Sequence, residues 1–208
     1  MNSKYKINLA CNGTHQIIAG LIGNNQKLVL DVGCNKGYLK DLAPENEFYG
    51  IDSDSNALEY AAKKYKVVCN FDLNSGTQSV DVGSKFDIIV FGDILEHTIY
   101  PEKVLSYFVN THLKDEGIVI VSLPNVAHVS IRLALLLGNF NYTDAGILDR
   151  THLHLYTSKT AQQLIASCNL AVVDKKFSSN NFGGIISMFP MLSTLLGFNL
   201  IYVCKKFS

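Results

Sequence analysis

The chain has 208 residues, of which 48% are hydrophobic and 17% charged, which is enough apolar material for a folded core and too much for a disordered chain. Lysine plus arginine and aspartate plus glutamate both number 18, and no basic tract occurs, so no nucleic-acid partner is expected. The length suits one α/β domain with an elaboration, and we place no domain boundary within residues 1–208.

The five cysteines have neither paired nor metal-ligand spacing, which is typical of reduced thiols in a cytoplasmic protein. The N-terminal residues lack the apolar core of a signal peptide. The longest apolar region, residues 182–202, is interrupted by Pro190 and Asn199 and is therefore unlike a membrane-spanning helix. We expect a cytoplasmic protein without stable membrane insertion.

An N-terminal segment, residues 1–26, contains an expected helix over 14–22 that Thr14 caps and Gly23 stops. Helices and strands then alternate up to Pro124. The expected elements are strand 28–32, helix 38–42, strand 48–52, helix 55–65 after a Ser53-Asp54-Ser55 cap, strand 67–71, strand 86–91, helix 101–113 and strand 117–123. This alternation is typical of parallel strands with right-handed crossovers in a doubly wound sheet.

The alternation ends after Pro124. The elements expected there are helix 126–137, an irregular loop over 139–156, a helix from the Thr157-Ser158 cap to about 168, and strands 170–177 and 198–205, for which antiparallel pairing is one arrangement. The apolar segment 183–197 has three interpretations: a lid over the site, a dimer or membrane-surface contact, or core packing. It has no basic face, which weakens the membrane interpretation.

The strand at 28–32 leads directly into the turn Gly33-Cys34-Asn35-Lys36-Gly37. Such a turn predicts a ligand lying against bare backbone with free N–H groups facing it. The turn lacks the Gly-x-Gly-x-x-Gly spacing of pyrophosphate cofactors. Asp31, just before the turn, would repel phosphate and attract a cationic group.

Acids follow three further predicted strands, at Asp52, Asp72 and Asp93. Ligands of open α/β sheets bind beyond the carboxyl ends of the strands, where these acids would gather. An acid after the second strand can accept hydrogen bonds from both ribose hydroxyls. The residues therefore favour an adenosyl ligand with an amino acid tail and a positive sulfur.

Four segments resemble the successive motifs of class I S-adenosylmethionine-dependent methyltransferases: Val29–Gly37, Tyr49–Asp52, Phe71–Leu73 and Phe86–His97. The resemblance covers roughly residues 27–125. It implies a seven-stranded, mostly parallel Rossmann-like sheet with an antiparallel last strand and helices on both faces. It also implies S-adenosyl-L-methionine as cofactor and S-adenosyl-L-homocysteine as product, with a cofactor-binding half over 27–123 and an acceptor-side half over 124–208.

The resemblance also implies a role for each matching residue. The amino acid end of the cofactor would lie on Asp31 and the turn (Gly33, Cys34, Asn35, Gly37), the ribose on Asp52 beside Ser53, the adenine on Asp72 and Leu73, and the methionine moiety above Gly92 and Asp93. Asn35 stands where the family usually has glycine, and asparagine tolerates positive φ better than most residues. Each acid also has a structural alternative: Asp31 as an acid that serves only the turn backbone, Asp52 as a helix cap, and Asp72 as a loop acid.

Leu123–His128 and Gly146–Thr157 resemble a bacterial subset of this family that accompanies glycan and secondary biosynthesis. This implies methyl transfer, for which we favour an oxygen of a small molecule or glycan precursor. An oxygen acceptor benefits from a general base, and the candidate histidines are His97, His128, His152 and His154.

We favour His152 as base or positioning residue, with Asp149 orienting it or binding the acceptor, and His97 near the acceptor. The alternative is a structural hydrogen-bond network of Asp149, Arg150 and His152. The spacing of these residues is not diagnostic of a metal site, and no metal is expected.

Two alternative functions remain open on the sequence. An N-methyltransferase would need less help from a base. A non-catalytic cofactor-binding partner of a glycan-biosynthesis enzyme is kept open by Asn35. A homodimer is also left open.

Overall fold

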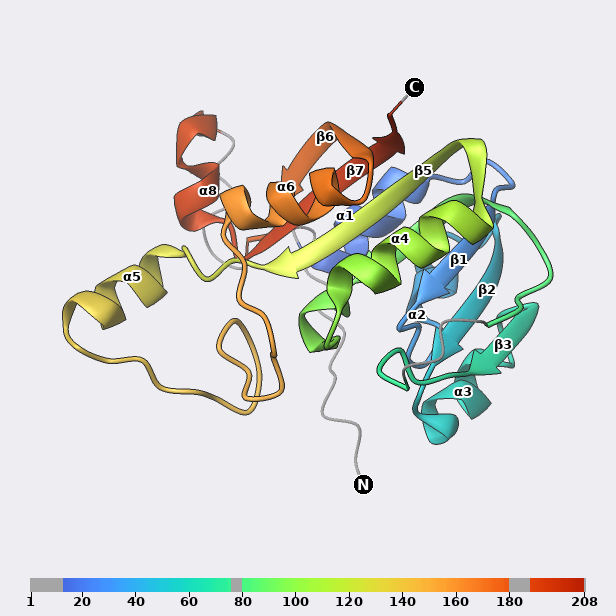
Figure 1. The fold of residues 1–208 in the computed structure, drawn as a ribbon, viewed down its shortest axis with the longest axis horizontal. Coiled ribbons are helices and arrows are strands. Elements are labelled where there is room, and N and C mark those ends of the chain that lie inside the picture. Colours follow the sequence, from blue (N-terminus) through green and yellow to red (C-terminus); the bar gives the residue numbers. More distant parts are fainter. Residues whose placement is uncertain (1–12, 76–79, 180–187, 208) are drawn as a thin grey trace.

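The computed structural model describes residues 13–75, 80–179 and 188–207 (Figure 1). Seven strands form one sheet in the order β3-β2-β1-β4-β5-β7-β6. Their bounds are β1 Leu28–Val32, β2 Glu47–Asp52, β3 Val67–Asn70, β4 Phe86–Gly92, β5 Leu113–Pro124, β6 Leu170–Phe177 and β7 Asn199–Lys206. The last strand, β7, pairs antiparallel with both β5 and β6, whereas the other pairs are parallel. The predicted fold class is confirmed.

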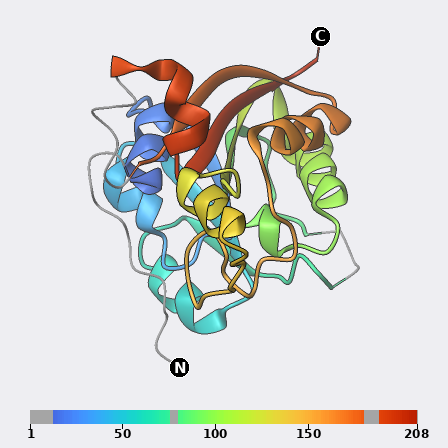
Figure 2. The ribbon, with the colours of Figure 1, turned by 90° about the vertical axis from the view of Figure 1, so that its left-hand side faces the viewer.

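Helices cover both faces of the sheet (Figure 2). The helices are α1 Thr14–Ile22, α2 Tyr38–Leu42, α3 Ser55–Ala61, α4 Pro101–His112, α5 Val129–Leu136, α6 Ser158–Ser167 and α8 Ser193–Leu196, with short 3₁₀ turns η1 Leu95–His97 and η2 Pro190–Leu192. One apolar core contains Ile18, Leu39 and Leu58 from α1, α2 and α3. The other contains Phe108 and Ile165 from α4 and α6.

The central strands β1 and β4 are buried on both faces, which is why their sequences are nearly continuous apolar runs. From β1 the chain proceeds outward to β2 and β3, and then crosses back to β4 on the other side of β1. The strand order therefore reverses between β1 and β4. The carboxyl ends of these strands are the place where open α/β sheets bind ligands.

Several predicted boundaries shift. Gly13, not Thr14, is the N-cap of α1, and no side-chain cap hydrogen bond forms there, so the predicted cap is wrong. The helix expected over 55–65 ends at Ala61. After it, the N–H groups of Lys63 and Lys64 donate to the carbonyls of Tyr60 and Ala61, three residues earlier, which is the spacing of a 3₁₀ turn rather than of an α-helix.

The helix expected over 126–137 begins only at Val129, with His128 as its N-cap. The strand expected over 117–123 starts earlier, since Leu113 already pairs with Phe86 at the beginning of β4.

The segment 183–197 falls partly outside the described residues. Within the described part, Met188 is 72% and Met191 85% exposed, and α8 has no buried residue. The core-packing interpretation is therefore wrong for this part. No helix among the described residues is both long and apolar enough to cross a membrane.

Candidate cofactor and acceptor site

Two adjoining cavities, of about 290 and 110 Å³, open at the carboxyl ends of β1, β2 and β4. They share Gly33, Asp52, Ser53, Ile94 and His97. Every predicted cofactor residue except Gly37 lines them: Asp31, Gly33, Cys34, Asn35, Asp52, Ser53, Gly92 and Asp93 in the larger cavity, and Asp72 and Leu73 in the smaller. The fold thus gathers residues from four separate sequence segments around one space.

The turn after β1 is held by its own backbone bonds. The N–H groups of Gly33 and Cys34 both donate to the Ile51 carbonyl, and the Gly37 N–H donates to the Cys34 carbonyl. The Asn35 N–H donates to Asp52. The expectation that the turn presents free N–H groups is therefore wrong at these four positions.

The two glycines serve close packing instead. Gly33 has φ +80°, and a Cβ there would lie 2.7 Å from the Ile94 side chain. Gly37 has φ +70°, and its Cβ would lie 3.2 Å from the Ala61 backbone. Asn35 occupies the same left-handed region at φ +48°, which asparagine tolerates. The turn therefore keeps its shape without a third glycine.

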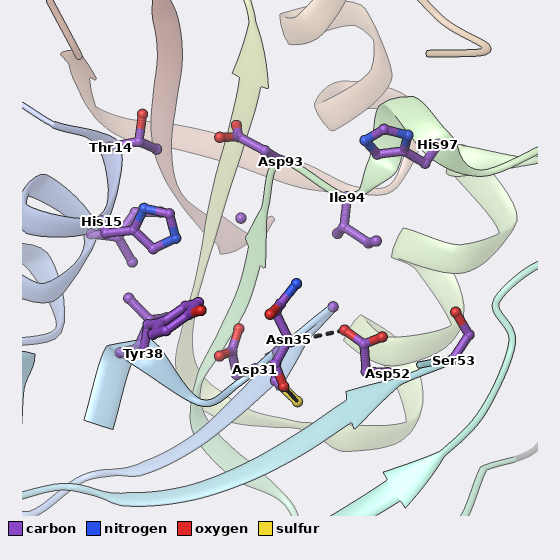
Figure 3. Close-up of a pocket in the computed structure, with 15 residues that line it drawn as sticks. Thr14, His15, Asp31, Asn35, Tyr38, Asp52, Ser53, Asp93, Ile94 and His97 are labelled. Atoms are coloured by element: carbon purple, nitrogen blue, oxygen red, sulfur yellow. Dashed lines mark hydrogen bonds between the residues drawn. The ribbon is translucent and has the colours of Figure 1, made fainter. Parts of the chain in front are cut away.

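Two internal hydrogen bonds fix the carboxylate of Asp52. One oxygen accepts the Asn35 N–H at 2.8 Å (Figure 3). The other oxygen accepts the Asp54 N–H at 2.9 Å. The helix cap of α3 is Asp54, which accepts from the N–H groups of Asn56 and Ala57. The interpretation of Asp52 as that cap is wrong, and its carboxylate is left facing the cavities.

Asp31 is a buried acid at the end of β1, only 5% exposed. Its carboxylate accepts a 2.6 Å hydrogen bond from the Tyr65 hydroxyl, so it does not serve only the turn backbone. Burial raises the pKa of Asp31 to about 7. Gly50 makes this contact possible, because a Cβ there would lie 2.7 Å from the Tyr65 ring.

Asp93 lies at the tip of β4 with φ +54°. One carboxylate oxygen accepts hydrogen bonds from Ser122 and from Asn199 on β7. Burial raises the pKa of Asp93, and the nearby His15 opposes that shift. The antiparallel strand therefore helps to position an acid that faces the cavity.

Sequence reasoning missed Thr14, His15 and Tyr38, which line one side of the larger cavity opposite Asp52 and Ser53 (Figure 3). They come from the first residues of α1 and α2. Burial lowers the pKa of His15. In the sequence they are marked only by their positions at the starts of the helices that precede and follow β1. Such positions do not distinguish them from ordinary surface residues.

On the acceptor side, His97 of η1 and His152 of the loop 139–156 stack edge to face with ring centroids 4.8 Å apart. The loop is held there because the N–H groups of Leu153 and His154 both donate to the Glu96 carbonyl. Burial and the neighbouring His152 lower the pKa of His97. His97 lines both cavities, so the pair lies at their edge.

The prediction that the Asp149 side chain orients His152 is wrong, whereas its alternative role in binding the acceptor stays a prediction. The Asp149 carboxylate accepts from the N–H and hydroxyl of Thr151, whereas the Nδ1 of His152 lies 3.0 Å from the Ile147 carbonyl. Arg150 pairs with Asp144 instead of joining a network with them. The backbone of the loop, rather than the carboxylate of Asp149, therefore orients the imidazole.

The other two candidate histidines lie elsewhere. His128 caps α5, with Nδ1 accepting from the Ser130 N–H. The Nε2 of His154 lies 3.4 Å from the Ile99 carbonyl. Of the four candidates, the structure brings together His97 and His152.

The sequence matches the methyltransferase domain family over residues 7–175, which is most of its length. The chain belongs to this family. A curated relative, the mitochondrial ubiquinone biosynthesis O-methyltransferase of Candida albicans, is 31% identical over 96 residues, which are 41% of this chain and 29% of the relative. The match thus spans less than a third of that relative's length.

Solved methyltransferases share the fold. An S-adenosylmethionine-dependent methyltransferase from Clostridium acetobutylicum aligns over 94% of this chain and 91% of its own, with a TM-score of 0.61 and 18% identity. Magnesium protoporphyrin IX methyltransferase from Synechocystis, with bound S-adenosylhomocysteine, aligns over 99% and 90%, with a TM-score of 0.67 and 15% identity. The chain therefore carries a methyltransferase domain, and it shares its fold with methyltransferases that use S-adenosylmethionine.

The residues of the cavity fit this cofactor. A buried carboxylate suits its ammonium group, and an acid after the second strand suits its ribose. The Oδ1 atom of Asn35 is buried and has no hydrogen-bond partner among the described residues. Buried polar atoms are rarely left unpaired, so this atom is expected to accept a hydrogen bond from the bound cofactor.

Asn35→Gly tests this expectation. Glycine keeps the left-handed turn but removes the acceptor, and one neutral hydrogen bond contributes about 0.5–1.5 kcal/mol, so S-adenosylhomocysteine should bind about 3- to 10-fold more weakly. Calorimetry measures the affinity, and thermal unfolding of the free protein serves as the control. Tighter binding by Asn35→Gly would mean that the asparagine obstructs the cofactor.

Proposed function

We propose that this methyltransferase acts on a hydroxyl group of a small molecule or glycan precursor, with His152 as general base or acceptor-positioning residue. The observation that carries the proposal is the contact of His152 with His97 at the edge of the cavity that Asp31, Asp52 and Asp93 line. The O-methyltransferase named above, 31% identical over 96 residues, supports an oxygen acceptor.

The cofactor residues are assigned by their positions in the two cavities. Asp31 would bind the ammonium group and Asp52 the ribose hydroxyls, while Asp72 and Leu73 would hold the adenine in the smaller cavity. Gly92 and Asp93 would lie against the methionine moiety. S-adenosylmethionine supplies an activated methyl group and a neutral thioether leaving group.

The protein must then position the acceptor and receive its proton. The Nδ1 of His152 faces a carbonyl oxygen, which can only accept, so Nδ1 carries the hydrogen. The Nε2 of the neutral imidazole therefore keeps its lone pair. An imidazole in this tautomer can take the proton of an acceptor hydroxyl at neutral pH.

His152→Ala tests the assignment. We expect at least a 100-fold loss of turnover, as for removal of a general base, with S-adenosylhomocysteine affinity within about twofold of the parent protein. Methyl transfer to a panel of phenols, sugars and amines measures turnover, and His154→Ala, in the same loop, is the matched control. An equal loss of turnover and affinity would assign His152 a structural role instead.

The same panel separates the rivals. Transfer to amines alone would favour the N-methyltransferase, and binding of the cofactor product without any transfer would favour the non-catalytic partner.

We further propose one functional unit over residues 1–208, with the cofactor half at 27–123. A cytoplasmic location is supported by the free thiols of Cys34, Cys69, Cys168 and Cys204.

A further inference from the structure

We propose that Glu96, His97 and His152 bind a divalent transition-metal ion at the acceptor side of the cavity. The inference deepens the proposed function and rests on it for the role of the ion in methyl transfer. The binding itself rests on the three side chains alone. It replaces the sequence-based expectation that no metal is bound.

The first observation is the state of Glu96. Its side chain is 0% exposed, and neither carboxylate oxygen has a hydrogen-bond partner among the described residues. Burying a carboxyl group without a partner is costly, and such groups are rare in folded proteins. The backbone carbonyl of Glu96, in contrast, accepts hydrogen bonds from the N–H groups of Leu153 and His154 and so holds the loop. A bound ligand would satisfy the two unpartnered carboxylate oxygens.

The second observation is the orientation of the two imidazoles. The Nδ1 of His97 lies 3.2 Å from the Thr151 carbonyl, and that of His152 lies 3.0 Å from the Ile147 carbonyl. Both Nδ1 atoms therefore donate, and both Nε2 atoms keep a lone pair. Histidines that bind metals through one nitrogen and donate the other N–H to a backbone carbonyl have this same arrangement.

The third observation is distance. One ligand atom from each of the three side chains lies within 4.8 Å of the others. In a tetrahedral site, metal–nitrogen and metal–oxygen bonds of about 2.0–2.2 Å place the ligand atoms about 3.4 Å apart, so a relative side-chain shift of about 1.5 Å closes the site. The turn η1 and the loop docked on it already fix the backbone positions of the three ligand residues. Binding of the ion therefore requires little additional ordering of the chain.

The ligand set indicates the kind of ion. Two imidazoles and one carboxylate suit zinc, manganese, iron or cobalt rather than calcium or magnesium, which prefer oxygen ligands. Three protein ligands leave at least one coordination position open, as in catalytic sites. His97 lines both cavities, so the open position is at the edge of the cofactor space.

The ion would activate the acceptor. The acceptor hydroxyl binds at the open position and releases its proton to solvent, because a bound divalent ion lowers the pKa of a ligated hydroxyl. The oxygen then forms a bond to the methyl carbon. The methyl–sulfur bond breaks with its electron pair remaining on sulfur, which yields the methyl ether and S-adenosylhomocysteine. In this arrangement the Nε2 of His152 is bound to the ion and the proton goes to solvent, so of the two roles proposed for His152 the ion selects acceptor positioning and not that of general base.

Calorimetric titration of the chelator-treated full chain with Zn²⁺, without cofactor or acceptor, tests the site. We expect one ion per chain, and about 10-fold or greater loss of affinity in each of Glu96→Gln, His97→Ala and His152→Ala. His154→Ala, from the same loop, should bind as the parent protein does. Co²⁺ should give visible absorption bands that the three ligand variants lose.

Absence of saturable Zn²⁺ binding would overturn the inference, as would equal binding by the parent protein and the His97→Ala and His152→Ala variants. The isosteric Glu96→Gln variant and the variants of the two half-buried histidines guard against a single folding failure, which thermal unfolding would reveal. Since ion binding is measured without methyl transfer, loss of the metal site and loss of the proposed activity are distinguished.

Discussion

Asp52→Ala is expected to weaken S-adenosylhomocysteine binding by about 100-fold or more. Two ribose hydrogen bonds to a charged acceptor contribute about 1.5–3 kcal/mol each, and each 1.4 kcal/mol is a factor of ten. The substitution also frees the Asn35 N–H, which Asp52 now accepts at 2.8 Å. Both effects act in the same direction, and calorimetry on the full chain measures their sum.

Asp41→Ala is the matched control, because Asp41 is an exposed acid of α2 that pairs with Lys64 and lines neither cavity. The Asp41→Ala variant should bind S-adenosylhomocysteine with the affinity of the parent protein. Asp52→Asn keeps an oxygen acceptor and should lose less affinity than Asp52→Ala. Unchanged affinity in Asp52→Ala would refute the ribose assignment.

Asp31→Asn is expected to stabilise the free protein above pH 7 and to weaken cofactor binding. The pKa of Asp31 is about 7 in the folded protein because of burial, and about 4 in an unfolded chain. The protonated acid is therefore favoured by folding. Its stabilising contribution is complete below about pH 4 and is lost as the pH rises through 7.

The variant removes this loss, so the free energies of unfolding of variant and parent should diverge between pH 4 and 7. At 1.4 kcal/mol per pKa unit, the shift of about three units corresponds to a difference of about 4 kcal/mol at pH 8. Denaturant unfolding across this range measures it. The affinity for S-adenosylhomocysteine should fall at the same time, because the amide cannot pair with an ammonium group.

Asp87→Asn provides a control of opposite sign. Partial burial acts to raise the pKa of Asp87, but hydrogen bonds from the Leu28 N–H and Lys114 outweigh it and lower the pKa. This acid stabilises the fold when ionised, so its variant should lose stability above pH 4. If both variants shifted stability in the same direction, the burial argument for Asp31 would be refuted.

The cofactor side of the fold could be predicted from sequence because its signals are local. A buried strand, a glycine turn and an acid after the next strand lie within a few tens of residues, and parallel topology forces their ends together. The strands at 28–32 and 170–177 have the predicted bounds. The wrong boundaries, such as the end of α3 at Ala61, depend on contacts that local sequence does not contain.

The partners of the site residues could not be predicted, because they come from distant segments. Tyr65 reaches Asp31 only because Gly50 leaves room for its ring. His152 was singled out by residue type, but its orientation depends on the carbonyl of Ile147 in a loop without regular structure. Glu96 is marked only by its burial without a side-chain hydrogen-bond partner among the described residues, which the sequence does not reveal.

The most direct test of the account is a calorimetric titration of the full chain with S-adenosylhomocysteine, run beside one with NAD. The cavity geometry and the family both predict saturable binding of one S-adenosylhomocysteine per chain and no binding of NAD. Binding of neither compound, or of NAD alone, would contradict the assignment of the β1 turn to a methyl-donor cofactor.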